Sequence, residues 1–234
     1  MKKYIYLDAE TIPDGEMEDF ELYKDPPKNI KDPEKIKKWE EEQKEEQFLK
    51  QSVDTNRAKI LTIGAAADDK KPVCFVDTVN FNELVILTEF QEYLKNEMTT
   101  TIVEGVSEPR TIFNELCFVG HNIKKFDLQL LFVKAVKYKL YELGTLIHPA
   151  RLRYNNGKSY DIMEIWGGAD TFNYISLDTV ARTIGVQGKK DGMDGSQVYT
   201  KFKEGKIDEI IEYQKDDVIL VRDIFKEIKP IIGL

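Results

Sequence analysis

Apolar and polar positions in the first third of the chain follow the pattern of β-strands. Residues 3–10 are rich in aromatic and β-branched side chains and run into the turn-forming letters IPDG, so they predict a strand. Residues 59–68 and 72–79 predict two more strands, and the turn DDKK between them predicts a hairpin. Together with the first strand, this hairpin predicts a meander.

The pattern after residue 80 alternates between helical and strand-like segments. Helices are predicted at residues 81–96, 126–140, 176–186 and 206–230, and strands at 116–122 and 158–165. Ser176 is expected to cap one helix, and Pro230 to end the last one. Residues 98–115 give no clear pattern, and 188–199 predict a loop rich in Gly and Asp. This order predicts an α/β fold, with a mixed central β-sheet flanked by helices on both faces.

A long charged segment interrupts this pattern between the first two strands. Residues 14–47 contain 13 acidic and 7 basic residues, which leaves a local charge of −6. The proline-rich start predicts a loop, and the Glu/Lys run from Pro33 onward predicts an exposed helix. We expect a single domain over residues 1–234 with a charged insertion or lid at about 14–57, although such charge is more often only a solvated surface.

The composition is that of a soluble globular protein, with 41% hydrophobic residues. No run of about 18 apolar residues predicts a membrane span. The N-terminus lacks a signal-peptide pattern, and Cys74 and Cys117 lie in predicted strands, so we expect a cytoplasmic protein of the bacterial or phage type. The two cysteines and two histidines do not cluster in the sequence, which argues against structural zinc.

Basic residues gather in one sector of this acidic chain. The net charge is −8, but residues 120–159 contain 8 Lys or Arg against 2 acidic residues. This sector could hold a phosphate backbone, with Arg151, Arg153 and Lys158 as contacts and Tyr154 as a stacking ring. The alternative is an exposed basic loop that is simply solvated.

Two carboxylates end the first predicted strand. Because strand side chains alternate, Asp8 and Glu10 share one face and stand roughly 7 Å apart along the strand. Two acids in that position repel each other and resist burial unless a positive charge lies between them. The pair therefore predicts a cation site.

The last predicted helix carries an acid on its apolar side. At about 100° per residue, Asp217 falls about 20° from the centre of the apolar stripe, whereas Asp216 lies on its flank. The stripe consists of Ile210, Val221, Ile224 and Ile228. Tyr213 lies one turn before Asp217 and is its neighbour on the helix surface. A core-facing Tyr and Asp predict a site between this helix and the sheet.

Asp127 opens a helix just after the buried strand at 116–122. An acid in a first helical turn is favoured by the helix dipole alone, so this position has a purely structural explanation. Ligands in open α/β sheets, however, gather at the carboxyl ends of parallel strands, where Asp8, Glu10 and Asp127 would meet. Oxygen-only ligation favours Mg²⁺ or Mn²⁺, and two such ions roughly 4 Å apart are the usual device for phosphodiester cleavage.

Three short motifs now stand in order along the chain: DAET from Asp8, NIKKFD from Asn122 and YQKDD from Tyr213. Together they resemble the three motifs of the DEDD (DnaQ-like) 3′–5′ exonucleases, and the Tyr-x-x-x-Asp form of the third resembles the tyrosine subclass. The middle motif is most similar to that of the proofreading exonuclease domain of family B DNA polymerases and of related stand-alone exonucleases.

The resemblance implies a ribonuclease H-like fold and a role for each motif residue. It implies four metal ligands for two divalent cations, Mg²⁺ or Mn²⁺: Asp8, Glu10, Asp127 and Asp217. Tyr213 would hydrogen-bond the attacking water, since a tyrosine near its usual pKa of about 10 positions a water rather than deprotonating it. Contacts to the 3′-terminal nucleotide are implied for Thr11 and Ile12, and contacts to the terminal strand for Asn122 and Phe126.

These residues predict a metal-dependent 3′–5′ exonuclease that removes nucleoside 5′-monophosphates from single-stranded DNA. The alternatives are the same chemistry on RNA or short oligonucleotides, and a catalytically silent nucleic-acid-binding module. The expected partner is a single-stranded 3′ end, DNA more than RNA, with a replication or repair protein as a further partner.

Four other polar features receive structural or supporting interpretations. We expect His121 to be structural, Asp161 to support the site from behind the ligands, and Asp178 to be a first-turn helix acid. The acids of the Gly/Asp loop at 185–195 are given no metal role.

Overall fold

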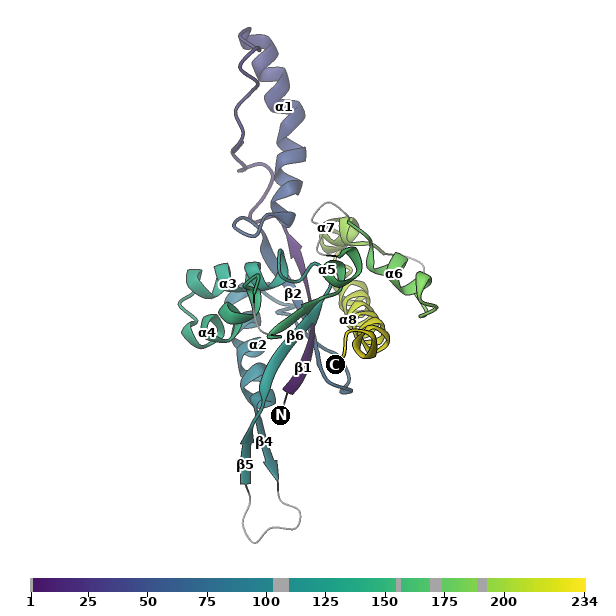
Figure 1. Ribbon diagram of the computed structural model, residues 1–234. Coiled ribbons are helices and arrows are strands. Elements are labelled where there is room, and N and C mark those ends of the chain that lie inside the picture. Colours follow the sequence, from purple (N-terminus) through teal and green to yellow (C-terminus); the bar gives the residue numbers. More distant parts are fainter. Residues whose placement is uncertain (1, 103–109, 155–156, 169–173, 189–192) are drawn as a thin grey trace.

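The computed structural model describes residues 2–102, 110–154, 157–168, 174–188 and 193–234 (Figure 1). Its strands are β1 (Lys2–Ile12), β2 (Lys59–Ala67), β3 (Val73–Phe75), β4 (Thr99–Ile102), β5 (Arg110–Phe113), β6 (Glu115–Gly120) and β7 (Ser159–Asp161). Its α-helices are α1 (Pro33–Lys50), α2 (Glu83–Met98), α3 (Asp127–Lys137), α4 (Tyr141–Arg151), α5 (Ile162–Gly167), α6 (Leu177–Thr183), α7 (Val198–Lys203) and α8 (Ile207–Ile231). Two short 3₁₀ turns, η1 (Gln51–Val53) and η2 (Gly195–Gln197), complete it.

The central sheet has five strands in the order β3-β2-β1-β6-β7. β1 pairs antiparallel with β2 and parallel with β6, and β6 pairs parallel with β7. The predicted meander of the first three strands is confirmed, and the sheet is mixed as expected. The carboxyl ends of β1, β6 and β7 therefore lie at one edge of the sheet.

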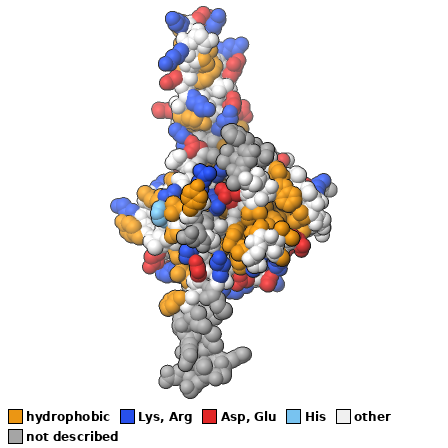
Figure 2. Space-filling view, in the orientation of Figure 1, with side chains coloured by type: hydrophobic (Ala, Val, Ile, Leu, Met, Phe, Trp, Pro, Cys, Tyr) orange, Lys and Arg blue, Asp and Glu red, His pale blue; other side chains and the backbone are white. Residues whose placement is uncertain are grey.

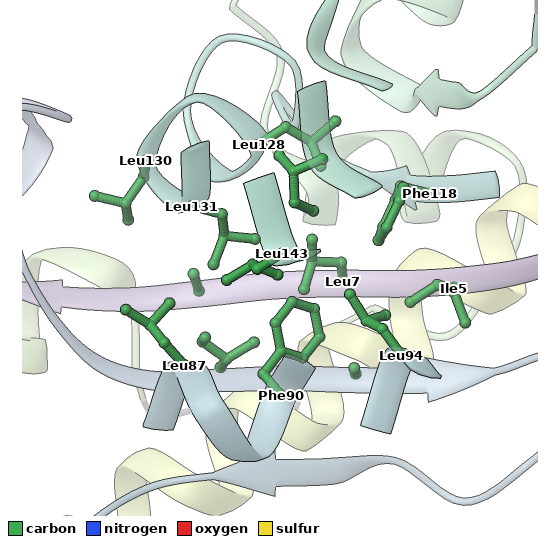
Figure 3. Packing of buried hydrophobic residues seen from close by; sticks show 14 of the residues in the cluster. Ile5, Leu7, Leu87, Phe90, Leu94, Phe118, Leu128, Leu130, Leu131 and Leu143 are labelled. Atoms are coloured by element: carbon green, nitrogen blue, oxygen red, sulfur yellow. The ribbon is translucent and has the colours of Figure 1, made fainter. Parts of the chain in front are cut away.

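One face of the sheet packs against α2, α3 and α4. Ile5 and Leu7 of β1 belong to this core, where they meet buried side chains of the three helices. Figure 3 shows Leu87, Phe90 and Leu94 of α2 and Leu128, Leu130 and Leu131 of α3 gathered around β1.

The opposite face packs against α8 and α6. Tyr6 of β1 and Val119 of β6 join the buried residues of these helices in a second core. The predicted apolar stripe of α8 is buried in full: Ile210, Val221, Ile224 and Ile228. Helices on both faces confirm the predicted α/β layering. Pro230 lies inside the last turn, so the helix runs to Ile231 instead of stopping at the proline.

An arm consisting of residues 13–58 connects β1 to β2, and α1 forms its long element. In Figure 1 the arm projects from the carboxyl end of β1, and in Figure 2 basic and acidic side chains intermix along it. Its base is anchored by Phe48, which is fully buried and contacts the rings of Phe20 and Tyr199 at 5.6 and 5.7 Å between centroids. The exposed charged helix predicted from Pro33 onward is thus present.

Two predicted segments differ from the structure. β7 ends at Asp161, and the rest of the strand predicted at 158–165 is helix α5, because the Asp161 side chain accepts a hydrogen bond from Met163 N and caps that helix. The predicted loop at 188–199 ends in η2 and the start of α7, because Asp194 and Gln197 form a capping box. The part of that loop at 189–192 lies outside the described residues.

Two further segments had no predicted structure. Helix α4 contains Gly144 and Pro149, two helix-disfavouring residues that hide its pattern. Within residues 98–115, Thr99–Ile102 and Arg110–Phe113 form β4 and β5, which pair in a separate two-stranded sheet. Across the described ranges, every helix is too short or too polar to cross a bilayer.

Candidate metal centre

Three acidic side chains meet at the carboxyl end of β1. Asp8 and Glu10 come from alternate positions of β1, and Asp217 comes from α8. Each offers a carboxylate oxygen, and these oxygens all lie within 4.8 Å of one another. Asp217 is only 6% exposed, and the other two residues are half-buried. Carboxylates this close repel one another, and hard oxygen donors at this spacing suit a divalent cation such as Mg²⁺ or Mn²⁺.

A glycine allows α8 to approach the sheet at this point. Gly64 of β2 pairs directly with Asp8 of β1. A Cβ atom at Gly64 would lie 2.7 Å from Gln214 Cγ and 2.9 Å from Val218 Cγ2, so any larger residue would push the helix away. The missing side chain thus lets Asp217 reach the acids of β1.

Gln214 fastens α8 to the backbone of β1. This fully buried side chain donates from Nε2 to Asp8 O at 3.1 Å, and its Oε1 accepts from Cys74 Sγ at 3.1 Å. Burial raises the pKa of the Cys74 thiol to about 12, so the thiol stays neutral and can donate. Gln214 was not among the predicted site residues, although a glutamine four residues after Ile210 falls on the apolar stripe of α8 and is a detectable signal.

A β-bulge follows the two acids of β1. The pairing of β1 with β2 changes register between Glu10 and Thr11. Bulges of this kind are common next to functional sites. Thr11 Oγ1 donates to Ser52 O at 2.6 Å, and Ile12 is 3% exposed. Both side chains are buried, so only their backbone atoms could contact a 3′-terminal nucleotide. That contact stays a prediction.

Asp127, the first residue of α3, contacts the backbone of β1. It is 4% exposed, and its Oδ1 accepts a hydrogen bond from Ala9 N at 3.0 Å. The parallel pairing of β1 with β6 ends at Tyr6, so Asp127 occupies the position beyond the last strand partner. Burial and then the nearby charge of Asp8 raise the pKa of Asp127 well above its usual range. Asp127 is therefore adjacent to the group of Asp8, Glu10 and Asp217. It is not one of the residues whose carboxylate oxygens all lie within 4.8 Å of one another.

Asp161 supports the loop that leads to Asp127. It is 2% exposed and lies at the carboxyl end of β7, where its carboxylate accepts from Asn122 N at 2.9 Å and from Lys124 N at 3.2 Å. Asn122 has a positive φ of 58°, which an asparagine tolerates better than most residues. Phe126 is half-buried against the α3 core. Asp161 thus holds the backbone of the loop before Asp127, which agrees with its predicted supporting role.

Tyr213 lies one turn before Asp217 on α8 and hydrogen-bonds to it. Burial, followed by the negative charges of Asp217 and Glu10, raises the pKa of Tyr213 far above that of a free tyrosine. The phenol therefore stays neutral near pH 7. Such a group can orient a water by hydrogen bonding but is unsuited to accept a proton from it.

His121 and Asp178 take structural roles. His121 Nε2 lies 2.7 Å from Ile175 O, which ties the end of β6 to the segment before α6. Asp178 lies in the first turn of α6 and pairs with Arg182 at 2.7 Å. Ser176 caps this helix as predicted.

Ion pairs within the protein neutralise several of the basic side chains of residues 120–159. Among the described residues, four lysines of this sector form ion pairs: Lys124 with Glu164, Lys134 and Lys137 with Glu83, and Lys158 with Glu115. Arg151 Nη1 donates to Gln129 at 3.0 Å. Arg151, Arg153 and Lys158 precede β7 and so lie at its amino end, whereas the carboxylates lie at the carboxyl ends of the strands. A phosphate contact by these residues would therefore lie away from the carboxylates, and it stays a prediction.

The structure thus places an acidic cluster at the carboxyl edge of a mixed α/β sheet flanked by helices. A family model described as "Predicted 3'-5' exonuclease related to the exonuclease domain of PolB" matches residues 46–225, more than half of the chain. The chain belongs to this family, and the predicted resemblance is confirmed. The matched range contains Asp127, Tyr213 and Asp217 but not Asp8 and Glu10, whose position comes from the structure.

The structure is similar to a family B DNA polymerase from the hyperthermophilic archaeon Pyrobaculum calidifontis. The TM-score is 0.56 at 14% sequence identity, and the likeness covers 97% of this chain but only 24% of the polymerase. At this identity the likeness shows the fold, and the predicted ribonuclease H-like architecture is confirmed. A comparison with curated protein sequences found no match.

Proposed function

We propose that this chain is a divalent-metal-dependent 3′–5′ exonuclease that hydrolyses single-stranded DNA from its 3′ end and releases nucleoside 5′-monophosphates. The observation that supports this most directly is the group of carboxylate oxygens from Asp8, Glu10 and Asp217 within 4.8 Å, inside a family of predicted 3′–5′ exonucleases. Two distant segments of the chain, β1 and α8, supply these acids.

The donor set suits two hard divalent cations. Asp8, Glu10 and Asp217 would hold them together with Asp127, and Mg²⁺ or Mn²⁺ matches a site made only of carboxylate oxygens. When bound, such ions supply Lewis acidity that lowers the pKa of water and stabilises charge on the phosphate oxygens.

The side chains around the acids would position the reactants. The neutral phenol of Tyr213 would orient the attacking water toward the phosphorus atom. The backbone of Thr11 and Ile12 would meet the terminal nucleotide, and Asn122 and Phe126 would meet the strand behind it. Gln214 and Gly64 keep α8 at the distance that this arrangement needs.

The wider expectations belong to the same proposal. We infer that residues 1–234 act as one exonuclease domain, and that the charged segment at 14–57 is an insertion beside the site rather than part of its chemistry. A cytoplasmic location and a replication or repair protein that delivers the substrate are consistent with this activity.

A nuclease assay on matched substrates tests the proposal. Single-stranded DNA and RNA of one sequence, labelled at the 5′ end, are incubated with Mg²⁺, Mn²⁺ or EDTA. We expect DNA to give a ladder that shortens from the 3′ end and disappears with EDTA and in Asp8→Ala. Asp216→Asn is the matched control, since Asp216 lies on the flank of α8 and should retain activity.

The other outcomes separate the alternatives. Faster degradation of RNA would replace DNA by RNA as the substrate of the same chemistry. No cleavage of either substrate by folded protein in Mg²⁺ or Mn²⁺ would contradict the proposal and favour a catalytically silent binding module.

A further inference from the structure

An exposed aromatic side chain lies beside the loop that leads to Asp127. Tyr174 is 68% exposed, and Lys125 Nζ lies 5.4 Å from the centroid of its ring. Lys125 is itself exposed and stands two residues before Asp127. A large exposed ring under a lysine ammonium is the combination that binds single-stranded nucleic acid, since a base can stack on the ring while the cation contacts a phosphate.

The residues next to this aromatic–lysine pair are anchored to the carboxyl ends of β6 and β7. Next to Tyr174, Ile175 O lies 2.7 Å from His121 Nε2, which anchors that segment to the end of β6. Next to Lys125, Lys124 N donates to the buried Asp161. The ring is therefore presented from an anchored position, which lowers the entropy cost of binding.

The charge of Lys125 remains available, unlike that of its neighbour. Lys124 forms an ion pair with Glu164 at 2.6 Å and is 14% exposed at its side chain. Within the described residues, Lys125 has no ion pair, and its ammonium lies over the ring of Tyr174. The two consecutive lysines thus differ in role, because one is neutralised and the other faces solvent at the site.

We propose that Tyr174 and Lys125 form a binding subsite for a single-stranded polynucleotide, upstream of the 3′ end that enters the metal centre. The ring would stack on a base behind the terminal nucleotide, and the ammonium would contact the adjoining phosphate. Stacking of this kind tolerates every base, so the subsite favours single strands without selecting a sequence. This inference rests on the proposed function, because the subsite would hold the strand that leads away from a 3′ end bound at the carboxylates.

The chain supplies its own control at the opposite edge of the sheet. Tyr154 is 83% exposed, and Arg153 lies 5.6 Å from its ring centroid, so this pair has the same chemistry. It precedes β7 and therefore lies at the amino end of the parallel strands, away from the carboxylates. Loss of Tyr154 should leave binding unchanged if position, and not only exposure, makes the subsite.

The test compares two substrates of different length. Kinetic constants are measured for an oligothymidylate and for the p-nitrophenyl ester of thymidine 5′-monophosphate, which is too short to reach the subsite. We expect Tyr174→Ala to raise KM for the oligothymidylate about tenfold. Its kcat and the hydrolysis of the ester should stay unchanged. Tyr174→Phe should restore KM, and Tyr154→Ala should behave as wild type.

A binding measurement separates this inference from the proposed function. The fluorescence anisotropy of a labelled oligothymidylate is followed in EDTA, where no cleavage occurs, for the same variants and for Lys125→Gln. We expect Tyr174→Ala to weaken binding, and Lys125→Gln to lower the salt dependence by about one phosphate contact. If wild type cleaves neither substrate, the proposed function fails while the anisotropy still tests the subsite. Equal affinity in wild type and folded Tyr174→Ala, or an equal loss in Tyr154→Ala, would overturn the subsite.

Discussion

At the scale of single residues, the carboxylate group of Asp8, Glu10 and Asp217 depends on a position without a side chain, Gly64. Gly64 faces Asp8 across the strands, and α8 occupies the space that a larger residue would need. Gln214 then holds α8 by a hydrogen bond to Asp8 O. The spacing of the acids is therefore set by neighbours that would not themselves touch metal or substrate.

Gly64→Ala should displace α8 and separate Asp217 from Asp8 and Glu10. The methyl group would overlap Gln214 Cγ, and overpacking of a core commonly costs about 1–3 kcal/mol of stability. We expect a lower thermal midpoint and a larger loss of nuclease activity than the stability change explains. Gly144→Ala is the control: its Cβ would meet only Ala135 Cβ at 3.8 Å, and in α4 it should be neutral or stabilising by about 0.5–1 kcal/mol. Equal activity in both variants would contradict this role of Gly64.

Tyr213→Phe should separate water positioning from metal binding. The phenol is assigned to orient the water and not to ligate a cation, so its loss should lower kcat about 100-fold or more. The affinity for Mn²⁺, measured by calorimetry, should stay close to that of wild type. A large loss of Mn²⁺ affinity with little change in kcat would show instead that the tyrosine serves the metal.

At the scale of elements, a buried ion pair joins α2, α3 and β2. Glu83 at the start of α2 pairs with Lys134 of α3 at 2.8 Å, and both side chains are almost fully buried. Glu83 Oε1 also accepts from Ile60 N of β2 at 2.7 Å. Burial alone would raise the pKa of Glu83, but the bonds from Lys134 and Ile60 N outweigh it and hold the pKa below its usual value.

Glu83→Gln should destabilise the fold, because it leaves Lys134 buried without its charge partner. Breaking such a pair costs about 3–5 kcal/mol near neutral pH. Since the folded pKa of Glu83 is lowered, its stabilisation is present above the unfolded pKa of about 4.3 and is lost as the pH falls through the folded value. The difference in urea stability between variant and wild type should therefore narrow on acidification below about pH 4. Glu115→Gln, which breaks a half-exposed pair with Lys158, should change little. A pH-independent difference would contradict the account.

The same scale shows what the sequence could predict. Strand alternation placed Asp8 and Glu10 on one face, and the period of α8 placed Asp217 in the core, because both depend only on local geometry. The bulge after Glu10 was not predictable in this way, since a change of register depends on the partner strand. Thr11 and Ile12, which follow it, are both buried. Helix α5 was not predicted because residues 158–165 keep the apolar pattern of a strand. The helix begins where Asp161 accepts a hydrogen bond from Met163 N, and the pattern does not show that bond. Gln214 was on the stripe but its partner, Asp8 O, is far away in sequence.

At the scale of the whole molecule, the site exists only after the two ends of the chain have packed together. β1 and α8 lie at opposite ends of the sequence, and the arm at residues 13–58 separates β1 from the rest. The arm joins the body at its base, through Phe48 with Tyr199 and through Glu16 with Lys203. Its distal part is exposed and charged.

Replacement of residues 27–42 by a short Gly/Ser linker should therefore leave the fold and the chemical step intact. We expect a thermal midpoint close to that of wild type and unchanged hydrolysis of the nitrophenyl ester. Any effect should be confined to KM for long single strands. Loss of ester hydrolysis in a folded variant would show that the arm completes the site.

Binding of Mn²⁺ to wild type, Asp217→Asn and Asp216→Asn tests the central claim most directly. Isothermal titration calorimetry without nucleic acid isolates the carboxylate group from every later step. We predict that wild type and Asp216→Asn bind Mn²⁺ alike, and that Asp217→Asn binds at least tenfold more weakly because it removes one of the three converging carboxylates. Equal affinity in all three proteins, each shown to be folded, would contradict a metal centre formed by Asp8, Glu10 and Asp217.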